Sequence, residues 1–296
     1  MTTQKWLDPI LRERKPLEPI KTNVQPSLRP LSGIKAVVFD VYGTLIVSGS
    51  GDVGSVDQTD RTGVLRDAFK EAGIDEAVAE MITWHDFLEA VELENASRRN
   101  SGCESPEVDV ISIWRNLLET RGWSAEGNSV SKIIRLATYF EAWANPTWPM
   151  PKATAVINDL SKQGFDLGIV SNAQIFTKVL VEDLLFSKKI NEGLFKTDLC
   201  FFSNRFRHSK PGPRLFQALA SSLKRRGILP QEAVYVGNDM LNDIWAAQQI
   251  GMKTAWFAGD QRSVRQRSKD SRCSKVSADL ILTSLPQLLE CLTLDK

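Results

Sequence analysis

The stretch VVFDVYGTL, residues 37–45, decides the fold of this chain. Three apolar residues come directly before Asp40, and a glycine and Thr44 follow it. A parallel strand that is buried on both faces has such an apolar run. Ligands of open α/β sheets bind beyond the carboxyl ends of the strands, so Asp40 is expected at the rim of a crevice. A carboxylate in that place serves as a nucleophile or as a metal ligand.

The composition argues against several other classes of protein. A chain of 296 residues can bury a core in one large domain or two smaller ones. Its net charge of +1 gives no global attraction for nucleic acid, and no apolar run is long enough for a membrane span. The two histidines are far apart, which disfavours zinc sites and Ser-His-Asp triads. Scattered cysteines and the lack of a signal layout predict a cytoplasmic protein.

Strands and helices alternate in the second half of the chain. The predicted strands are residues 34–45, 165–170, 199–202, 233–236, 254–257 and 280–282, and the predicted helices are 152–163, 174–186, 214–226 and 242–250. This alternation is typical of an α/β protein with a doubly wound parallel sheet, a Rossmann-like core.

A helical segment interrupts this alternation right after the first strand. Apolar residues recur at helical spacing between residues 59 and 145, and they predict about four helices bundled together. Residues 55–146 are therefore expected to form an inserted helical cap, and residues 34–54 and 147–296 the core. The tryptophans that gather in the cap could line a substrate pocket, although such aromatic residues more often pack a core.

Three segments lack periodicity. Residues 1–33 contain five prolines and predict an extended arm along the surface. The glycine- and serine-rich residues 48–54 form either a mobile flap or a simple turn. Residues 261–275 carry six basic residues and one acid, which could recruit an acidic substrate, but a solvated loop is favoured.

Polar residues follow the predicted strands in a regular order. They are Asp40, the pair Ser171 and Asn172, then Lys210, then Asn238 and Asp239 with Asp243 nearby. Each has an ordinary explanation when it is taken alone. Ser and Asn cap helices, an isolated lysine is usually solvated, and acids favour the first turn of a helix. Their arrival together at successive strand ends predicts one site.

This set of motifs resembles that of the haloacid dehalogenase (HAD) superfamily, in the subfamily with a helical cap between its first and second motifs. The stretches SKPGPRLF, residues 209–216, and YVGNDMLNDIWAAQQIGM, residues 235–252, are especially similar to the family's third and fourth motifs. The resemblance extends from Lys35 to Leu289. It implies a HAD-like hydrolase that acts on a small molecule, and it predicts no oligomeric state.

The resemblance implies a role for each of these polar residues. Asp40 would attack the substrate and form a covalent aspartyl intermediate that water hydrolyses. Thr44, Ser171 and Asn172 would bind the anionic group of the substrate, through the Ser171 hydroxyl and the Asn172 backbone N–H. Lys210 would offset negative charge on the nucleophile and the intermediate.

The resemblance also implies a magnesium site. Mg²⁺ prefers carboxylate and carbonyl oxygens, and the expected ligands are Asp40 and the backbone carbonyl of Tyr42. Asp239 and Asp243 would complete the site. Asn238 stands where the family usually has its first acid, so either Asn238 or Asp239 would face the metal.

Tyr42 separates the possible reactions. HAD phosphatases usually have an aspartate here that protonates the leaving group, whereas a phenol with an ordinary pKa of about 10 is a poor acid at neutral pH. The 2-haloacid dehalogenases share the Asp-x-Tyr-Gly-Thr pattern and need neither an acid nor a metal. The acids of the fourth motif nevertheless favour a Mg²⁺-dependent phosphatase of a small phosphoester. The alternatives are a metal-independent 2-haloacid dehalogenase and a weakened HAD fold with a binding or regulatory role.

Overall fold

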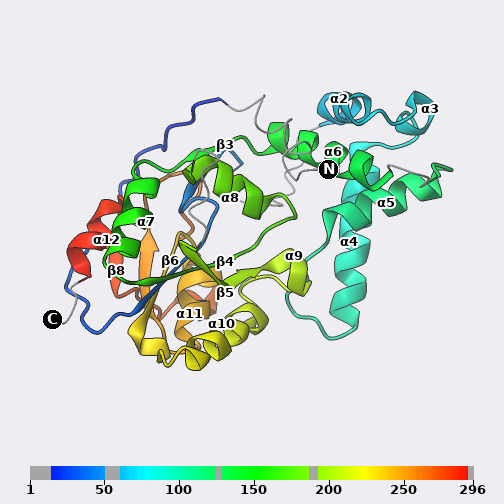
Figure 1. The fold of residues 1–296 in the computed structure, drawn as a ribbon. Coiled ribbons are helices and arrows are strands. Elements are labelled where there is room, and N and C mark those ends of the chain that lie inside the picture. The colour runs from blue at the N-terminus through cyan, green and yellow to red at the C-terminus, as the bar shows by residue number, and fades with distance from the viewer. Residues whose placement is uncertain (1–14, 51–60, 125–128, 187–192, 293–296) are drawn as a thin grey trace.

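The computed structural model describes residues 15–50, 61–124, 129–186 and 193–292. The predicted boundary between core and cap, at residues 54 and 55, lies outside these ranges, as does most of the predicted flap. A six-stranded, wholly parallel sheet forms the core, in the order β5-β4-β1-β6-β7-β8 (Figure 1). Its strands are β1 (Ala36–Phe39), β4 (Asp166–Ser171), β5 (Phe195–Phe202), β6 (Ala233–Gly237), β7 (Lys253–Phe257) and β8 (Leu280–Leu282).

Helices cover both faces of this sheet, as the α/β alternation predicts. Side chains of β1 alternate between the faces, so Val37 and Phe39 pack in one cluster and Ala36 and Val38 in another. The first cluster includes side chains of α7 (Ala153–Lys162), α8 (Thr177–Phe186) and α12 (Pro286–Cys291). The second includes α10 (Pro213–Arg225) and α11 (Ala246–Gln248). The predicted doubly wound fold is therefore confirmed.

The strand order places the site. The chain passes from β1 to β4 and β5 on one side, and then crosses back to β6, β7 and β8 on the other side of β1. Ligands of doubly wound sheets bind at such a reversal, beyond the carboxyl ends of the strands. Asp40 directly follows β1, Ser171 ends β4, and Gly237 ends β6.

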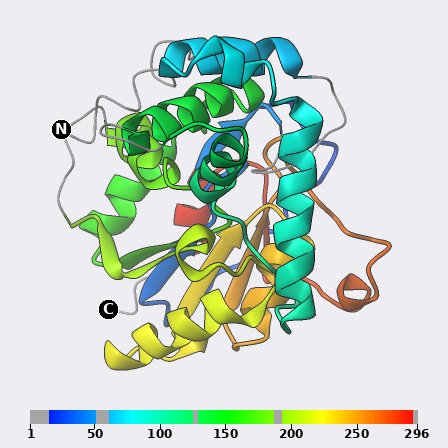
Figure 2. The same cartoon turned by 90° about the vertical axis from the view of Figure 1, so that its right-hand side faces the viewer.

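Five helices of the described residues form the cap, one more than the sequence predicts. They are α2 (Thr62–Ala72), α3 (Glu76–Ala79), α4 (Trp84–Asn100), α5 (Val110–Thr120) and α6 (Ser129–Ala144). They share a hydrophobic core of their own, in which Phe87 and Trp114 stack with ring centroids 4.4 Å apart. Figure 2 shows these helices above the core, with α4 descending along its side.

A short two-stranded antiparallel sheet between core and cap is absent from the sequence predictions. β2 (Ile46–Ser48) pairs with β3 (Thr147–Pro149), which are the two strands where the chain leaves the core and returns to it. Ser48 Oγ donates a hydrogen bond of 2.7 Å to Asn145 Oδ1 beside this pairing. This pair of strands therefore ties the end of α6 to the segment that follows the nucleophile.

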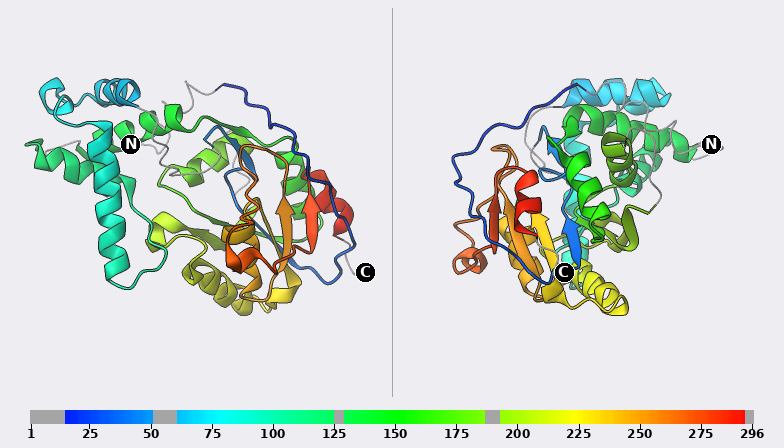
Figure 3. Two further views of the ribbon diagram at one scale, coloured as in Figure 1. Left: turned by 180° about the vertical axis from the view of Figure 1, so that it is seen from behind. Right: turned by 60° about the vertical axis from the view of Figure 1, so that its left-hand side comes forward.

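The described part of the N-terminal arm, residues 15–33, is extended and lies along the core (Figure 3). Ser27 pairs with Ile281 of β8, and Leu31 pairs with Leu292. The buried Thr22 hydroxyl donates to the carbonyl of Ala258, 2.7 Å away. Short elements complete the core: α9 (Ser203–Phe206), η1 (Pro230–Glu232), the π-helical turn η2 (Met240–Trp245) and η3 (Ser271–Cys273). Within the described ranges, no helix has the length and apolar character that a membrane span requires.

Candidate active site

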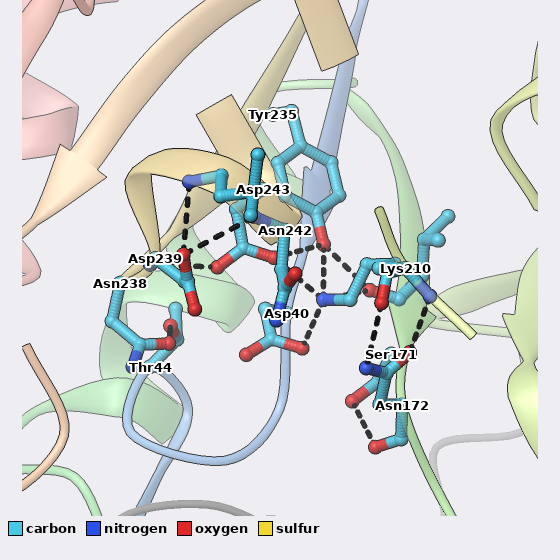
Figure 4. A network of polar contacts seen from close by, with 12 residues as sticks. Asp40, Thr44, Ser171, Asn172, Lys210, Tyr235, Asn238, Asp239, Asn242 and Asp243 are labelled. Carbon is cyan, nitrogen blue, oxygen red and sulfur yellow. Dashed lines mark hydrogen bonds and ion pairs between the residues drawn. The ribbon is translucent and has the colours of Figure 1, made fainter. Parts of the chain in front are cut away.

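Residues from four segments meet at the carboxyl ends of β1, β4 and β6, as Figure 4 shows. They surround a polar cavity of about 20 Å³, which is room for about one water molecule. The cavity is lined by Asp40, Tyr42, Ser171, Asn172, Lys210, Asn238, Asp239, Asn242 and Asp243. The structure thus brings together all the predicted site residues except Thr44, which lies next to this group.

Lys210 is the centre of the polar network. Its ammonium group lies 2.7 Å from Asp40 Oδ1 and 2.6 Å from Asp243 Oδ1. It also donates to the Tyr235 hydroxyl, 3.0 Å away. Burial disfavours the charged form, but Asp243 and Asp40 outweigh it and raise the pKa of Lys210 well above its ordinary value. A buried ammonium between two carboxylates holds both of them in fixed positions.

The turn after β1 directs the Asp40 carboxylate into the cavity. Gly43 has a φ of +78°, and a Cβ atom there would lie 2.4 Å from Ser263 Cβ, so only glycine fits without a shift. The backbone N–H groups of Leu45 and Ile46 both donate to the carbonyl of Val41. Among the described residues, only Oδ1 of Asp40 has a side-chain partner, so Oδ2 is the oxygen available for attack.

Ser171 and Asn172 lie at the end of β4. Asn172 Oδ1 accepts a hydrogen bond of 2.7 Å from the backbone N–H of Lys210, so this side chain positions the lysine loop. The Ser171 hydroxyl lines the cavity and donates to the carbonyl of Asn172. The predicted role of these two residues in substrate binding remains a prediction, and Asn172 gains a positioning role besides.

The side chain of Asn238 forms hydrogen bonds with two neighbours. Its amide nitrogen donates to the carbonyl of Ser263 at 2.5 Å, and its amide oxygen accepts a longer bond of 3.3 Å from the Thr44 hydroxyl. An aspartate here would set a carboxylate oxygen against the Ser263 carbonyl, and neither atom could donate. The loop that carries Ser263 therefore favours asparagine, where the family usually has an acid.

Asp239 is also engaged, mainly by a residue that the sequence interpretation missed. Arg267 forms an ion pair with it, with Nη2 2.6 Å from Oδ2 and Nε bonded to both oxygens. The other bonds to Asp239 Oδ1 come from the backbone N–H groups of Leu241 and Asn242 at the start of η2. Arg267 adopts a φ of +53°, in the left-handed region that is uncommon for non-glycine residues. Arg267 is exposed, as the prediction of a solvated basic loop implies, but its ion pair with Asp239 was not predicted.

Asp243 completes the buried acids. One oxygen accepts from Lys210, and the other accepts from the backbone N–H of Asp239 at 2.9 Å. Burial raises the pKa of the Asp243 carboxyl; Lys210 opposes this change, while Asp40 and Asp239 add to it. Three carboxyl groups thus lie near two cations, Lys210 and Arg267, at the cavity.

The environment of Tyr42 makes it a poor general acid. Its hydroxyl bonds to Thr177 Oγ1 at 2.9 Å, and the side chain is buried. Burial is the main reason that the pKa of Tyr42 lies well above its ordinary value, and Glu141 raises it further. The phenol is therefore an even weaker proton donor than the sequence suggests.

Tyr235 is a second residue that the sequence interpretation missed. Its hydroxyl donates to the carbonyl of Val170 at 2.6 Å and accepts from Lys210. In the sequence it is one of several apolar or aromatic residues of a buried strand, so only its position two residues before Gly237 hinted at the site. Tyr235 therefore helps to hold the Lys210 ammonium group between Asp40 and Asp243.

Comparison with known sequences identifies the family of this chain. A sequence profile of haloacid dehalogenase-like hydrolases matches residues 34–251, which is most of the chain. The chain belongs to this family. It is 38% identical over 84 residues to glyceraldehyde 3-phosphate phosphatase of Pyrococcus furiosus, a match that covers 28% of the chain and only 31% of that relative. A protein of the same name from Methanopyrus kandleri is 27% identical, with 80% of the chain and 90% of the relative covered.

Solved HAD structures show the same fold. The 2-haloacid dehalogenase of Pseudomonas syringae pv. Tomato superposes with a TM-score of 0.53 at 18% identity, over 87% of the chain and 97% of the dehalogenase. At this identity the likeness concerns the fold alone. The reaction has to be inferred from the residues of the site.

The donor set fits a magnesium ion held by few side chains. Within the described ranges, no three acid, histidine or cysteine side chains form a ready-made metal cluster. Lys210 and Arg267 occupy several of the carboxylate oxygens instead. Mg²⁺ usually takes only one or two protein carboxylates, together with waters and substrate phosphate. The Asp40 carboxylate and the two further acids that line the cavity meet that need.

Proposed function

We propose that this HAD-like hydrolase is a Mg²⁺-dependent phosphatase of small phosphomonoesters, with Asp40 as the nucleophile. The observation that carries the proposal is the Asp40 carboxylate, with one oxygen held by Lys210 and the other open to a polar cavity that two further acids line. The relatives named as glyceraldehyde 3-phosphate phosphatases support phosphoester cleavage. The free cysteines of the described residues suit a reducing compartment such as the cytoplasm.

The reaction has two displacements at phosphorus. Asp40 Oδ2 attacks the phosphorus atom, the bond to the ester oxygen breaks, and the leaving oxygen takes a proton from water. Water then attacks the phosphorus of the aspartyl phosphate, inorganic phosphate leaves, and the carboxylate of Asp40 is restored. Lys210 offsets charge on the aspartyl group, and the Ser171 hydroxyl and Asn172 N–H donate to phosphoryl oxygens.

The metal would be held by Asp40, the backbone carbonyl of Tyr42 and Asp243. When bound, Mg²⁺ would offset the charge of the phosphoryl group. Both oxygens of Asp239 are bonded to Arg267, whereas the amide oxygen of Asn238 accepts only the 3.3 Å bond from the Thr44 hydroxyl. In this proposal Asn238, whose amide oxygen is the less engaged of the two, therefore faces the metal in preference to Asp239.

A 2-haloacid dehalogenase is the second candidate, and Tyr42 favours it. In that reaction Asp40 attacks carbon, the carbon–halogen bond breaks, and the halide leaves without a proton. A site whose only residue at the acid position is a raised-pKa phenol suits such a leaving group. The three acids around the cavity have no evident use in that reaction, so phosphatase remains the first proposal.

The test compares both reactions in the same preparations. With a generic phosphomonoester and Mg²⁺, the wild-type protein should release phosphate, and EDTA should abolish the release. Asp40→Asn should lower kcat at least about 1,000-fold. Asp198→Asn, a change at an exposed acid of β5 that pairs with Arg226, is the matched control and should retain full activity. Chloride release from 2-chloropropionate without metal would favour the dehalogenase. Turnover of neither substrate would leave a binding role for the fold.

A further inference from the structure

Arg267 contacts the fourth motif from a loop outside it. It lies 28 residues after Asp239 along the chain, between β7 and β8. The side chain of Arg267 is 36% exposed, whereas that of Asp239 is only 7% exposed. The guanidinium group is therefore accessible from solvent and at the same time in contact with a carboxylate that lines the nucleophile's cavity.

This contact engages both oxygens of Asp239. Nε of Arg267 lies 3.2 Å from Oδ1 and 3.1 Å from Oδ2, and Nη2 lies 2.6 Å from Oδ2. Several charge-assisted bonds between one guanidinium group and one carboxylate make a strong ion pair with a defined geometry. The arginine thus supplies the cation that Asp239 would otherwise lack.

The two oxygens of Asp239 differ in their other partners. Oδ1 also accepts from the backbone N–H groups of Leu241 and Asn242, at 2.9 Å and 3.2 Å, and so caps the start of η2. Within the described part of the chain, Oδ2 accepts only from Arg267. Without the guanidinium group, the capping bonds would still hold the carboxylate, and Oδ2 would be left without a partner.

Asp239 is close to the other acids of the site. It lines the same small cavity as Asp40 and Asp243 (Figure 4), and its backbone N–H donates to Asp243 Oδ2 at 2.9 Å. An open carboxylate oxygen in this position is a suitable ligand for a hard cation. The ion pair with Arg267 therefore withholds a potential metal ligand from the site.

We infer that Arg267 is an internal counter-ion that keeps Asp239 from coordinating Mg²⁺ and thereby weakens the affinity of the site for the metal. The inference rests on the Mg²⁺-dependent function proposed above. The guanidinium group and the metal compete for Oδ2 of Asp239, and the charge of the arginine also repels the metal. The ion then depends more on waters and on substrate phosphate for its ligands.

Calorimetric titration of Mg²⁺ into the protein without substrate, at constant ionic strength, tests the inference. Arg267→Gln should lower the dissociation constant of Mg²⁺ about 10-fold or more relative to the wild type. Arg267→Lys keeps the charge and should stay within about 3-fold of the wild type. Arg272→Gln is the matched control, because it removes the same charge from an exposed arginine that pairs with Asp270, and it should bind Mg²⁺ as the wild type does.

A double variant shows whether Asp239 is the ligand that Arg267 withholds. In Arg267→Gln/Asp239→Asn the freed carboxylate is gone, so the affinity for Mg²⁺ should return to within about 3-fold of the wild type. Thermal unfolding without metal checks that each variant is folded. A gain in affinity that persists in full in the double variant would come from the lost positive charge alone, and it would overturn the role of Asp239.

The same titrations separate this inference from the proposed function. If Arg267→Gln binds Mg²⁺ no more tightly than the wild type, the role of Arg267 is overturned and the phosphatase proposal still stands. If Arg267→Gln binds Mg²⁺ and the wild type does not, Arg267 excludes the metal, and only the Mg²⁺ dependence of the proposed function fails. Absence of binding in every variant would overturn both.

Discussion

Lysine 210 shows how much one side chain organises this site. Its ammonium group bonds to Asp40, which follows β1, and to Tyr235 and Asp243 of the fourth motif. The lysine therefore orients the nucleophile and offsets the charge of its neighbours at once. The spacing of motifs in the sequence predicted Asp40, Lys210 and Asp243 correctly as neighbours, because parallel strands end at a common edge.

The part of the site that the sequence did not predict depends on contacts between distant segments. Arg267 lies 28 residues after Asp239, in a loop without periodicity, and only the folded loop brings the two together. Asn238 likewise depends on Ser263. Such pairs have no local signal, since neither spacing nor propensity distinguishes them from solvated loop residues.

Tyr42→Phe tests the conclusion that the phenol is no acid catalyst. The variant loses only the bond to Thr177, which still bonds to the backbone N–H of Gln174. We expect kcat to stay within about 3-fold of wild type and stability to fall by about 1 kcal/mol. Steady-state kinetics with an alkyl phosphate, whose leaving group needs a proton, provide the measurement. A loss of about 100-fold or more would instead make Tyr42 the general acid.

Glu141 predicts a pH dependence of stability. Burial raises its pKa from 4.5 to about 7, with Asn145 and Arg61 opposing. Between these values the folded protein binds a proton that the unfolded chain has lost, so stability falls as pH rises from 4.5 through 7. Glu141→Gln removes this loss. The free energy of unfolding of the variant, relative to that of the wild type, should therefore rise by about 1–3 kcal/mol across that pH window.

Urea unfolding of both proteins below, within and above that pH range measures the effect. Tyr42 also interacts with Glu141, and its raised pKa keeps it neutral throughout. The difference between the proteins should level off above pH 7. A difference that is the same at every pH would show that Glu141 ionises normally.

At the scale of elements, the turn after β1 is the most constrained piece of backbone near the nucleophile. Gly43→Ala would place a methyl group 2.4 Å from Ser263 Cβ and 2.8 Å from Asn238 Nδ2, at a positive φ. We expect a loss of stability of about 1–3 kcal/mol and a clear fall in kcat, because the shift moves Asp40. Thermal unfolding and kinetics measure the two effects.

Gly63→Ala is the control for that substitution. Gly63 lies near the start of α2, with an ordinary φ and no atom within 4 Å of an added Cβ. Alanine there should leave kcat unchanged and raise stability by up to about 1 kcal/mol. If both variants lost activity equally, the turn at Gly43 would have no special role.

Most elements follow from local patterns, and the exceptions have a common physical cause. The buried strands read as apolar runs, and the helices of the core as amphipathic segments. β2 and β3 are short strands almost 100 residues apart, so only tertiary pairing reveals them. The π-helical turn η2 also escaped prediction, because Asp239 and Asp243 hold its first residues through side-chain bonds.

At the scale of the whole molecule, the N-terminal arm is linked to the active site. Asp260 is buried and accepts hydrogen bonds from the backbone N–H groups of Ile20 and Arg262. The segment 260–267 also contains Ser263, which lies next to Gly43, and Arg267, which forms an ion pair with Asp239. The arm therefore supports the loop that covers the fourth motif.

Asp260→Ala measures this link. The change leaves backbone donors of the arm and the loop unpaired, and it should cost about 1–3 kcal/mol of stability. It should also lower kcat, since Ser263 and Arg267 lose their support. Thr22→Val removes a single bond of the arm, to Ala258, and should destabilise the protein less without affecting kcat. Equal kcat values for Asp260→Ala and wild type would separate the arm from catalysis.

The whole fold serves to present one carboxylate oxygen, and the covalent intermediate on it is the central claim. The protein is mixed with ³²P-labelled phosphomonoester and Mg²⁺, quenched in acid within the first turnover and reduced with borotritide, which labels an acyl phosphate at its carboxyl carbon. The account predicts tritium at Asp40 and nowhere else in the peptide map. Label at another residue, or phosphate release in a single turnover with no labelled carboxyl group, would contradict it.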